Sequence, residues 1–207
     1  MTQPSLPQGD WQHLGLIDFA RLVIDALEAA EADYMLGGAL AVAAWAEARS
    51  TQDVDIVVSV PLERFNRLSE ELAKRDMLVP VDVILDIFLE TRADLPLNAI
   101  HVHAGYKAEL FLLRPEDDLR AAAFARRQLI DLGPPLGLVY VHSPEDLILY
   151  KLHYFRLSQQ PKHVRDIVSI LLAMGNALDV VYLEDWARRL ELTELWDEIK
   201  RQAQEKS

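Results

Sequence analysis

The 207 residues suffice for one domain with an elaboration or for two small domains, and a hydrophobic fraction of 51% is ample for a buried core. With 21 Lys and Arg against 33 Asp and Glu, the net charge of -12 argues against a broad, non-specific grip on a nucleic-acid backbone. The chain has no cysteine, which excludes disulfides and thiolate metal sites and favours hard cations with oxygen ligands, such as Mg²⁺.

No targeting or membrane-spanning segment is predicted. Residues 1–13, "MTQPSLPQGDWQH", lack the basic start and apolar middle of a signal peptide, and no apolar run approaches the length of a membrane span. We therefore expect a cytoplasmic protein that has no membrane partner.

The first half of the chain alternates between predicted helices and strands. Residues 16–32 have apolar residues at helical spacing, and the short apolar segment 34–36 is followed by a glycine turn and the helix formers of 39–48. The β-branched segment 53–60 indicates a buried strand, and 62–76 has the mixed pattern of a surface helix.

The second half adds a hairpin and then becomes helical. Residues 77–90 are ambiguous by periodicity, and we favour a helix after Pro80. Residues 99–113 are typical of a hairpin that turns at 104–106, residues 114–132 predict one helix, and 136–143 predict a strand. Ser143 and Pro144 then mark a helix start, and the remaining pattern is helical. The prediction is an α+β fold: a mixed sheet domain over 1–142 that includes the N-terminal helix, and a helical region over 143–207 packed on it.

Two aspartates stand at the start of the predicted strand 53–60. Side chains at i and i+2 share one face of a strand, so Asp53 and Asp55 project together. Two neighbouring carboxylates repel each other, and a cation between them would relieve the repulsion. Mg²⁺ takes one or two carboxylates together with substrate phosphates. A solvated strand end is the alternative interpretation.

Two glycines precede the aspartates. A strand that turns through Gly37 and Gly38 into a helix offers backbone N–H groups to an anion, although a glycine pair alone is more often a simple tight turn. No GK[ST] follows, so this is not a P-loop. A nucleoside triphosphate needs both a phosphate cradle and a cation site. The joint occurrence of the two glycines and the two aspartates therefore favours a site for a nucleoside triphosphate.

At this point the sequence resembles the nucleotidyltransferase superfamily, which includes DNA polymerase β and small bacterial nucleotidyltransferases. The resemblance rests on Leu36-Gly37-Gly38 and Asp53-Val54-Asp55-Ile56, separated by residues 39–52, and covers about 33–172. The run "RSTQDVD" at 49–55 and "SPEDLILYKL" with a later "RDI" are similar to the abortive-infection and toxin–antitoxin branch. The implied fold is a nucleotidyltransferase-like mixed sheet flanked by helices.

The resemblance also implies a third carboxylate on a neighbouring strand. Glu109 is the candidate, on one strand face with Lys107 and Phe111, while an ordinary edge-strand glutamate is the alternative. Asp82 and Asp86 are rivals that we expect on a helix. In the implied site, Asp53, Asp55 and Glu109 hold two Mg²⁺ ions when nucleotide is bound, and Glu109 helps to deprotonate the attacking hydroxyl.

Further residues of the implied site would bind the nucleotide. Gly37 and Gly38 would hold the β and γ phosphates. Thr51 would donate its hydroxyl or stabilise a turn, and Arg49 would pair with phosphate or with neighbouring acids. Lys151 either reaches the phosphates or extends to solvent.

Three functions remain open. The first is transfer of a nucleoside monophosphate from a triphosphate to a hydroxyl of an acceptor RNA or protein, with a cognate toxin or antitoxin protein as a further partner. The second is a non-catalytic module that binds a nucleotide or a partner. The third is an aminoglycoside or lincosamide nucleotidyltransferase, whose cationic acceptor suits an acidic chain.

Overall fold

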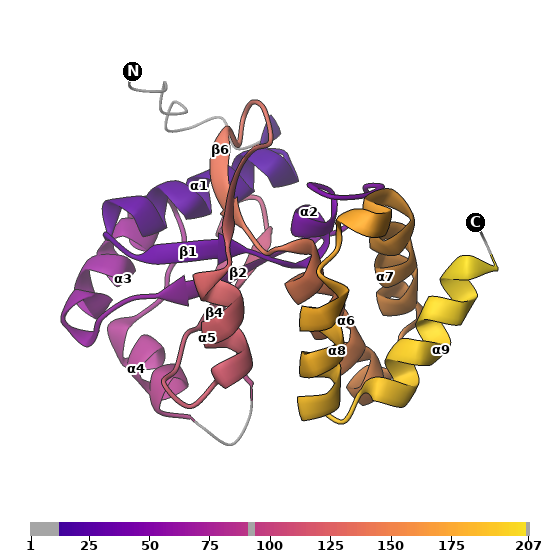
Figure 1. Cartoon of the computed structure of the whole chain (residues 1–207). Coiled ribbons are helices and arrows are strands. Elements are labelled where there is room, and N and C mark those ends of the chain that lie inside the picture. The colour runs from indigo at the N-terminus through magenta and orange to yellow at the C-terminus, as the bar shows by residue number, and fades with distance from the viewer. Residues whose placement is uncertain (1–12, 91–93, 206–207) are drawn as a thin grey trace.

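The computed structural model of the protein describes residues 13–90 and 94–205 (Figure 1). Nearly all of the N-terminal segment 1–13, in which no signal peptide is predicted, therefore lies outside the described residues. In chain order the elements are α1 (Leu16–Ala29), β1 (Asp33–Leu36), α2 (Gly38–Val42), β2 (Asp53–Ser59), η2 (Leu62–Arg64), α3 (Phe65–Ala73), α4 (Val81–Leu89), β3 (Leu97–Ile100), β4 (Lys107–Leu112), α5 (Asp118–Ala125), β5 (Gln128–Asp131), β6 (Leu138–Val141), α6 (Pro144–Ser158), α7 (Pro161–Met174), η3 (Gly175–Ala177), α8 (Val180–Arg189) and α9 (Thr193–Gln204).

The strands form a six-stranded mixed sheet in the order β3-β4-β2-β1-β6-β5. β2 is parallel to β4 and β1 is parallel to β6, whereas β1 and β2 are antiparallel. This arrangement brings the starts of β2 and β4 to the same edge of the sheet as the ends of β1 and β6. The sheet therefore places the predicted carboxylates beside the glycine turn that follows β1.

The two faces of the sheet differ in what covers them. Alternate residues of β2 and β4 are fully buried and belong to the main hydrophobic core, with α1, α3 and α4 on that side: Val54, Ile56, Val58, Ala108 and Leu110. The opposite face carries the two aspartates and Glu109 at its edge. Deeper on that face, Val57 and Phe111 pack with residues of α5 in a separate small cluster.

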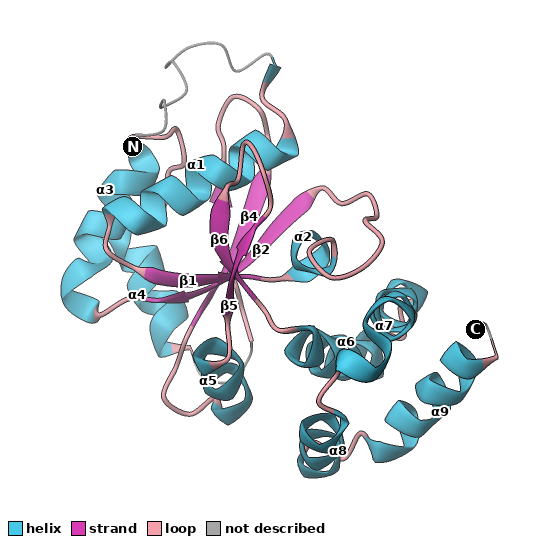
Figure 2. Cartoon of the chain, turned by 45° about the horizontal axis from the view of Figure 1, so that its top comes forward, coloured by secondary structure: helices cyan, strands magenta, loops and turns pink. Residues whose placement is uncertain are grey.

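The C-terminal helices form the other half of the molecule (Figures 1 and 2). α6 packs against α7 and α8, and α2 contacts both α6 and α7. Buried residues of the helices, such as Ile148 and Trp196, belong to the same core cluster as Val141 of the sheet. In the described ranges 13–90 and 94–205, no helix has the length and apolar character needed to cross a bilayer.

Most of the predicted elements are confirmed, including α4 after Pro80, the hairpin of β3 and β4, and the start of α6. Ser143 caps α6, because its Oγ accepts a hydrogen bond from Asp146 N at 3.1 Å.

Two predictions are wrong. The helix expected over 39–48 ends at Val42, and turns lead from there towards β2. The single helix expected over 114–132 ends at Ala125, and Gln128–Asp131 forms the edge strand β5, paired with β6. Tertiary pairing with β6 overrides the local helix pattern there.

Candidate active site

The two predicted aspartates and Glu109 lie on adjacent parallel strands. Asp55 is the Cα partner of Glu109, and Asp53 is the partner of Lys107. Because both strands start at this edge, all four side chains project from one face. Lys107 Nζ lies 2.6 Å from Glu109 Oε1 and 3.4 Å from Asp53 Oδ1, so its ammonium bridges the strands.

Asp55 differs from its neighbours because no ion-pair partner approaches it within the described residues. Burial, followed by the charge of Glu109, raises the pKa of Asp55 to about 6. In Lys107, by contrast, the hydrogen bond to Glu109 stabilises the charged form, which also raises the pKa of that group. The carboxylate at Asp55 is therefore the one that a cation would stabilise most.

The glycine turn contacts Asp55 directly. Gly37 N donates a hydrogen bond to the carbonyl oxygen of Asp55 at 2.7 Å, so this amide holds the turn against β2. Gly38 has φ +58°, and a Cβ there would overlap Asp55 Oδ2. The turn needs glycine at 38 both for its backbone conformation and for the approach of the carboxylate. Because α2 has only five residues, its dipole contributes little to anion binding.

Positive charge faces the carboxylates across the site. Asp166 on α7 accepts from Arg49 Nε at 2.7 Å and lies 2.8 Å from Lys151 Nζ. Burial opposes the charge on Asp166, but the hydrogen bond from Arg49 and the charge of Lys151 outweigh it and lower the pKa of Asp166. Two cations share one carboxylate, so the cluster has one surplus positive charge, and Lys162 adds another at the rim.

Thr51 and Arg156 are placed differently from these cations. Asp53 N donates to Thr51 Oγ1 at 3.4 Å, the local contact of a residue that stabilises a turn. Arg156 Nη1 donates to the carbonyl oxygen of Leu190, whereas Asp166 pairs with Arg49 and Lys151.

One cavity of about 400 Å³ collects these groups. Its lining includes every site residue predicted from the sequence: Gly37, Gly38, Arg49, Thr51, Asp53, Asp55, Glu109 and Lys151. One wall is the sheet face with the carboxylates, and the other is formed by α6 and the start of α7. The cavity is therefore acidic on the sheet side and basic on the helix side.

The inner end of the cavity is aromatic, and sequence reasoning missed it. The Arg120 guanidinium lies over the rings of Phe111 and Tyr150, at 5.5 and 5.9 Å from their centroids. His142 is buried beside Gly37, and its burial lowers its pKa to about 3, so the imidazole is neutral at pH 7. Tyr150 and Tyr154 follow Leu147 at the i+3 and i+7 spacing of one helix face. That spacing was the signal that could have identified the wall of α6.

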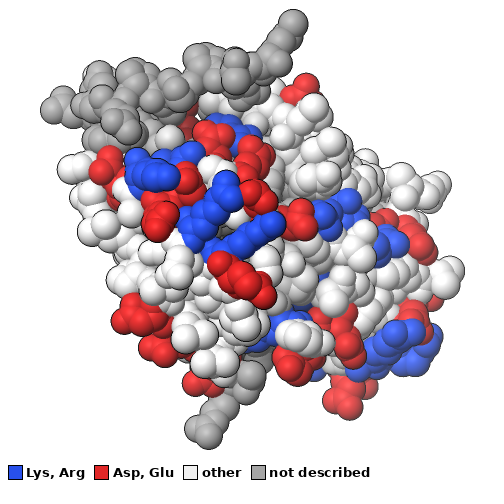
Figure 3. Space-filling view, turned by 90° about the vertical axis from the view of Figure 1, so that its left-hand side faces the viewer, with Lys and Arg blue, Asp and Glu red and all other residues white. Residues whose placement is uncertain are grey.

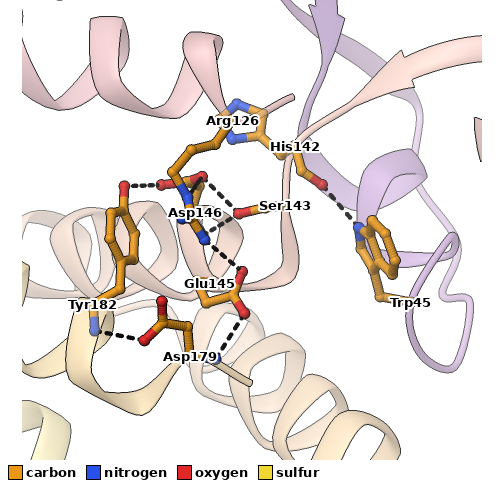
Figure 4. Close-up of polar contacts among 8 residues, drawn as sticks. All are labelled: Trp45, Arg126, His142, Ser143, Glu145, Asp146, Asp179 and Tyr182. Atoms are coloured by element: carbon orange, nitrogen blue, oxygen red, sulfur yellow. Dashed lines mark hydrogen bonds and ion pairs between the residues drawn. The ribbon is translucent and has the colours of Figure 1, made fainter. Parts of the chain in front are cut away.

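A network of buried polar groups fixes the start of α6 (Figure 4). Asp146 accepts from the hydroxyls of Ser143 at 2.6 Å and of Tyr182 at 2.7 Å, and Arg126 Nη2 lies 3.2 Å from Glu145 Oε2. On the other side of the junction, Trp45 Nε1 donates to the carbonyl oxygen of His142 at 2.8 Å. These contacts tie α8 and the segment after α2 to the point where sheet and helices join.

Comparison with known proteins identifies the fold. No protein-family model and no curated sequence matches the chain. The solution structure of the antibiotic-resistance factor ANT(2'')-Ia aligns over 86% of this chain and 94% of its own, with a TM-score of 0.56 and 15% identity. A crystal structure of ANT(2'')-Ia in complex with adenylyl-2''-tobramycin aligns over 84% of this chain and 98% of its own, with a TM-score of 0.58 and 13% identity. The chain has a nucleotidyltransferase fold.

An antigenic nucleotidyltransferase-like protein from Paracoccidioides brasiliensis aligns over 73% of this chain and 75% of its own, with a TM-score of 0.45 and 20% identity. The predicted α+β class and its nucleotidyltransferase-like sheet are confirmed. The toxin–antitoxin branch stays a prediction.

The resemblance of the sequence to the nucleotidyltransferase superfamily implies a divalent metal at the carboxylates. Within the part of the chain that the structure describes, no three His, Cys, Asp or Glu side chains form a group able to hold a metal ion on their own. Asp53 and Asp55 nevertheless offer oxygen donors beside a cavity large enough for phosphates. This fits Mg²⁺, which binds through one or two carboxylates and completes its coordination with substrate and water.

Proposed function

We propose that the protein is a magnesium-dependent nucleotidyltransferase that moves a nucleoside monophosphate from a nucleoside triphosphate to an acceptor hydroxyl. The observation that carries the proposal is the cavity in which Asp53 and Asp55 face Lys151 and Arg49 across the glycine turn. One wall suits a cation, and the opposite wall suits the phosphates that the cation would neutralise.

In the proposed reaction, groups that line the cavity accept the proton and neutralise the phosphates. The acceptor oxygen attacks the α-phosphorus, the bond from that phosphorus to the oxygen bridging to the β-phosphate breaks, and pyrophosphate leaves. The proton of the hydroxyl passes to the carboxylate of Glu109, which Lys107 holds in place. Arg49, Lys151 and Lys162 neutralise the triphosphate. Mg²⁺ held by Asp53 and Asp55 would supply Lewis-acid stabilisation of the phosphoryl oxygens.

The acceptor proposed first is a hydroxyl of an RNA end or of a protein, as the resemblance to the toxin–antitoxin branch implies. The net charge of -12 favours a protein or a short RNA end over a long RNA duplex. On the face shown in Figure 3, Lys and Arg side chains are interspersed with Asp and Glu, an arrangement without the one-sign field that grips a phosphate backbone.

A small cationic acceptor is the second candidate, and a second cavity favours it. This cavity, of about 730 Å³, shares Arg120 and Tyr150 with the first and is otherwise rich in acids: Asp94, Glu116, Asp117 and Asp118. The four carboxylates outnumber the guanidinium groups of Arg114, Arg120 and Arg189 that also line it. ANT(2'')-Ia was crystallised with adenylyl-2''-tobramycin, so a hydroxylated antibiotic belongs among the acceptors tested.

The test follows label from each α-labelled nucleoside triphosphate, with Mg²⁺, into bulk transfer RNA, cell protein or aminocyclitol antibiotics. Wild type is compared with the Asp53→Ala/Asp55→Ala double variant. Transfer that the double variant loses supports the enzyme and identifies its acceptor class. Magnesium-dependent nucleotide binding without any transfer would favour a binding module, and no binding at all would overturn the proposal.

A further inference from the structure

Lys107 lies among the carboxylates at which the resemblance implies two metal ions. It stands opposite Asp53 in the parallel pairing of β2 and β4, and Glu109, two residues later, stands opposite Asp55. The alternation of β4 puts Lys107 and Glu109 on the same face, so the lysine belongs to the site by register.

The ammonium spans the gap between the strands. Nζ lies 2.6 Å from Glu109 Oε1 and 3.4 Å from Asp53 Oδ1, and 34% of the Lys107 side chain is exposed. A metal ion bridging Glu109 and Asp53 would have to occupy the space that this ammonium fills. Asp53 and Asp55, in contrast, remain available to one ion on the side of the glycine turn.

The charges of the cluster favour one ion before nucleotide binds. Asp53, Asp55 and Glu109 bring three negative charges and Lys107 returns one positive charge, so two negative charges remain for a single divalent ion to neutralise. When nucleotide is bound, its phosphates add negative charge, and the position of the Lys107 ammonium between Glu109 and Asp53 carries the count of ions.

We propose that Lys107 takes the place of one of the two metal ions, so that the nucleotide-bound protein holds a single divalent ion at Asp53 and Asp55. The inference rests on the proposed function and departs from the two-ion arrangement that the resemblance implies. Lys107 then holds Glu109 and supplies positive charge on the side of the site that faces Glu109.

The test counts bound ions and does not depend on turnover. Mn²⁺ is titrated into the full chain with saturating α,β-methylene analogues of ATP, GTP, CTP and UTP, one at a time. The free ion is followed by electron paramagnetic resonance, and the signal of each analogue alone is subtracted. Wild type is expected to bind one Mn²⁺ per chain, and Lys107→Met is expected to bind two because Glu109 and Asp53 become free to share an ion.

Three variants serve as controls. Lys107→Arg keeps the charge and should stay at one ion. Lys74→Met removes an ion-paired lysine outside the cavity, the partner of Glu71, and should also stay at one. Lys107→Met/Glu109→Gln removes the carboxylate that the second ion needs and should return to one. Circular dichroism and the melting temperature establish that each variant is folded.

Two ions in wild type, or one ion in folded Lys107→Met, would overturn this inference and leave the proposed function intact. No bound Mn²⁺ with any analogue would overturn the proposed function together with the inference. The two failures are therefore distinguishable in one titration.

Discussion

Lys151 and Asp166 form an ion pair in which 7% and 3% of the two side chains are exposed, with 2.8 Å between Nζ and Oδ2. The pair joins α6 to α7, the two helices of the basic wall. Arg49, from the segment before β2, bonds the same carboxylate. The wall that faces the sheet carboxylates is thus assembled around one aspartate.

Removal of this carboxylate charge should destabilise the protein. Asp166→Asn leaves the buried Lys151 ammonium without its counter-charge, and we expect the free energy of unfolding at pH 7 to fall by about 3 kcal/mol. Asp185→Asn is the control, because Asp185 pairs with the exposed side chains of Arg188 and Arg189 and should lose less than about 1 kcal/mol. Equal losses in urea titrations of the two variants would contradict a buried, shared charge at Asp166.

Substitution of Gly38 should affect activity more than stability. In Gly38→Ala the new methyl group displaces the Asp55 carboxylate, so nucleotide transfer should fall by at least about 100-fold, because several kcal/mol of metal-dependent stabilisation is at stake. The matched control is Gly105→Ala. Gly105 also has positive φ, at +71°, but a Cβ there meets nothing within 4 Å.

Both glycine variants should lose about 1 to 2 kcal/mol of unfolding free energy to the left-handed backbone conformation. Only Gly38→Ala should lose transfer. Equal transfer rates in the two variants would show that Asp55 and the turn tolerate a wider separation than the structure indicates.

The raised pKa of Asp55 makes stability depend on pH in a defined direction. The folded-state pKa of about 6 lies above the ordinary value of 3.8, so the folded chain binds the proton more tightly than the unfolded chain does. The contribution to stability is complete below about pH 4 and is lost as the pH rises through 6. Asp55→Asn should therefore be more stable than wild type at pH 8, by about 2 to 3 kcal/mol, with the gain vanishing near pH 4.

Urea titrations from pH 4 to 8 without metal measure this difference. Asp82→Asn, on the exposed face of α4, is the control and should show no such pH-dependent gain. Addition of Mg²⁺ at pH 8 should stabilise wild type and leave Asp55→Asn unchanged. A gain in the unfolding free energy of Asp55→Asn that does not vary with pH would contradict a raised pKa of Asp55.

Glu109→Gln should slow transfer by about 100-fold to 10,000-fold, because the amide cannot accept the proton of the acceptor hydroxyl. The affinity for nucleotide should change little, since Asp53, Asp55 and the basic wall remain. Single-turnover rates and nucleotide titrations separate the two effects. A loss confined to affinity would remove Glu109 from the proton transfer.

The sequence predicted the parts of the site that depend on local patterns. The β-branched run after Asp53 and the Ser143-Pro144 start of α6 each specify an element through neighbouring residues alone. Because Asp53 and Asp55 are two residues apart in one strand, the two-residue period of a strand predicts that they share a face. The cavity accordingly gathers the residues that the motifs indicated.

The remainder depends on pairings between distant segments. Nothing near Lys107 in the sequence shows that Asp53 is its neighbour, because the register of β2 with β4 fixes that contact. The contact of Arg120 with Phe111 and Tyr150 likewise unites three separate elements. β5 was missed for the same reason: four residues that follow a helix without an intervening Gly or Pro become a strand only because β6 is beside them.

The close approach of Gly38 to Asp55 links the two positions in evolution. A homologue that keeps both the aspartate and this left-handed turn has no room for a methyl group at 38. A homologue with a larger residue at 38 must therefore have a turn of another shape or a displaced carboxylate. The residue types at 38 and 55, taken together, then indicate the local shape of the turn, even where overall identity is too low to align the rest.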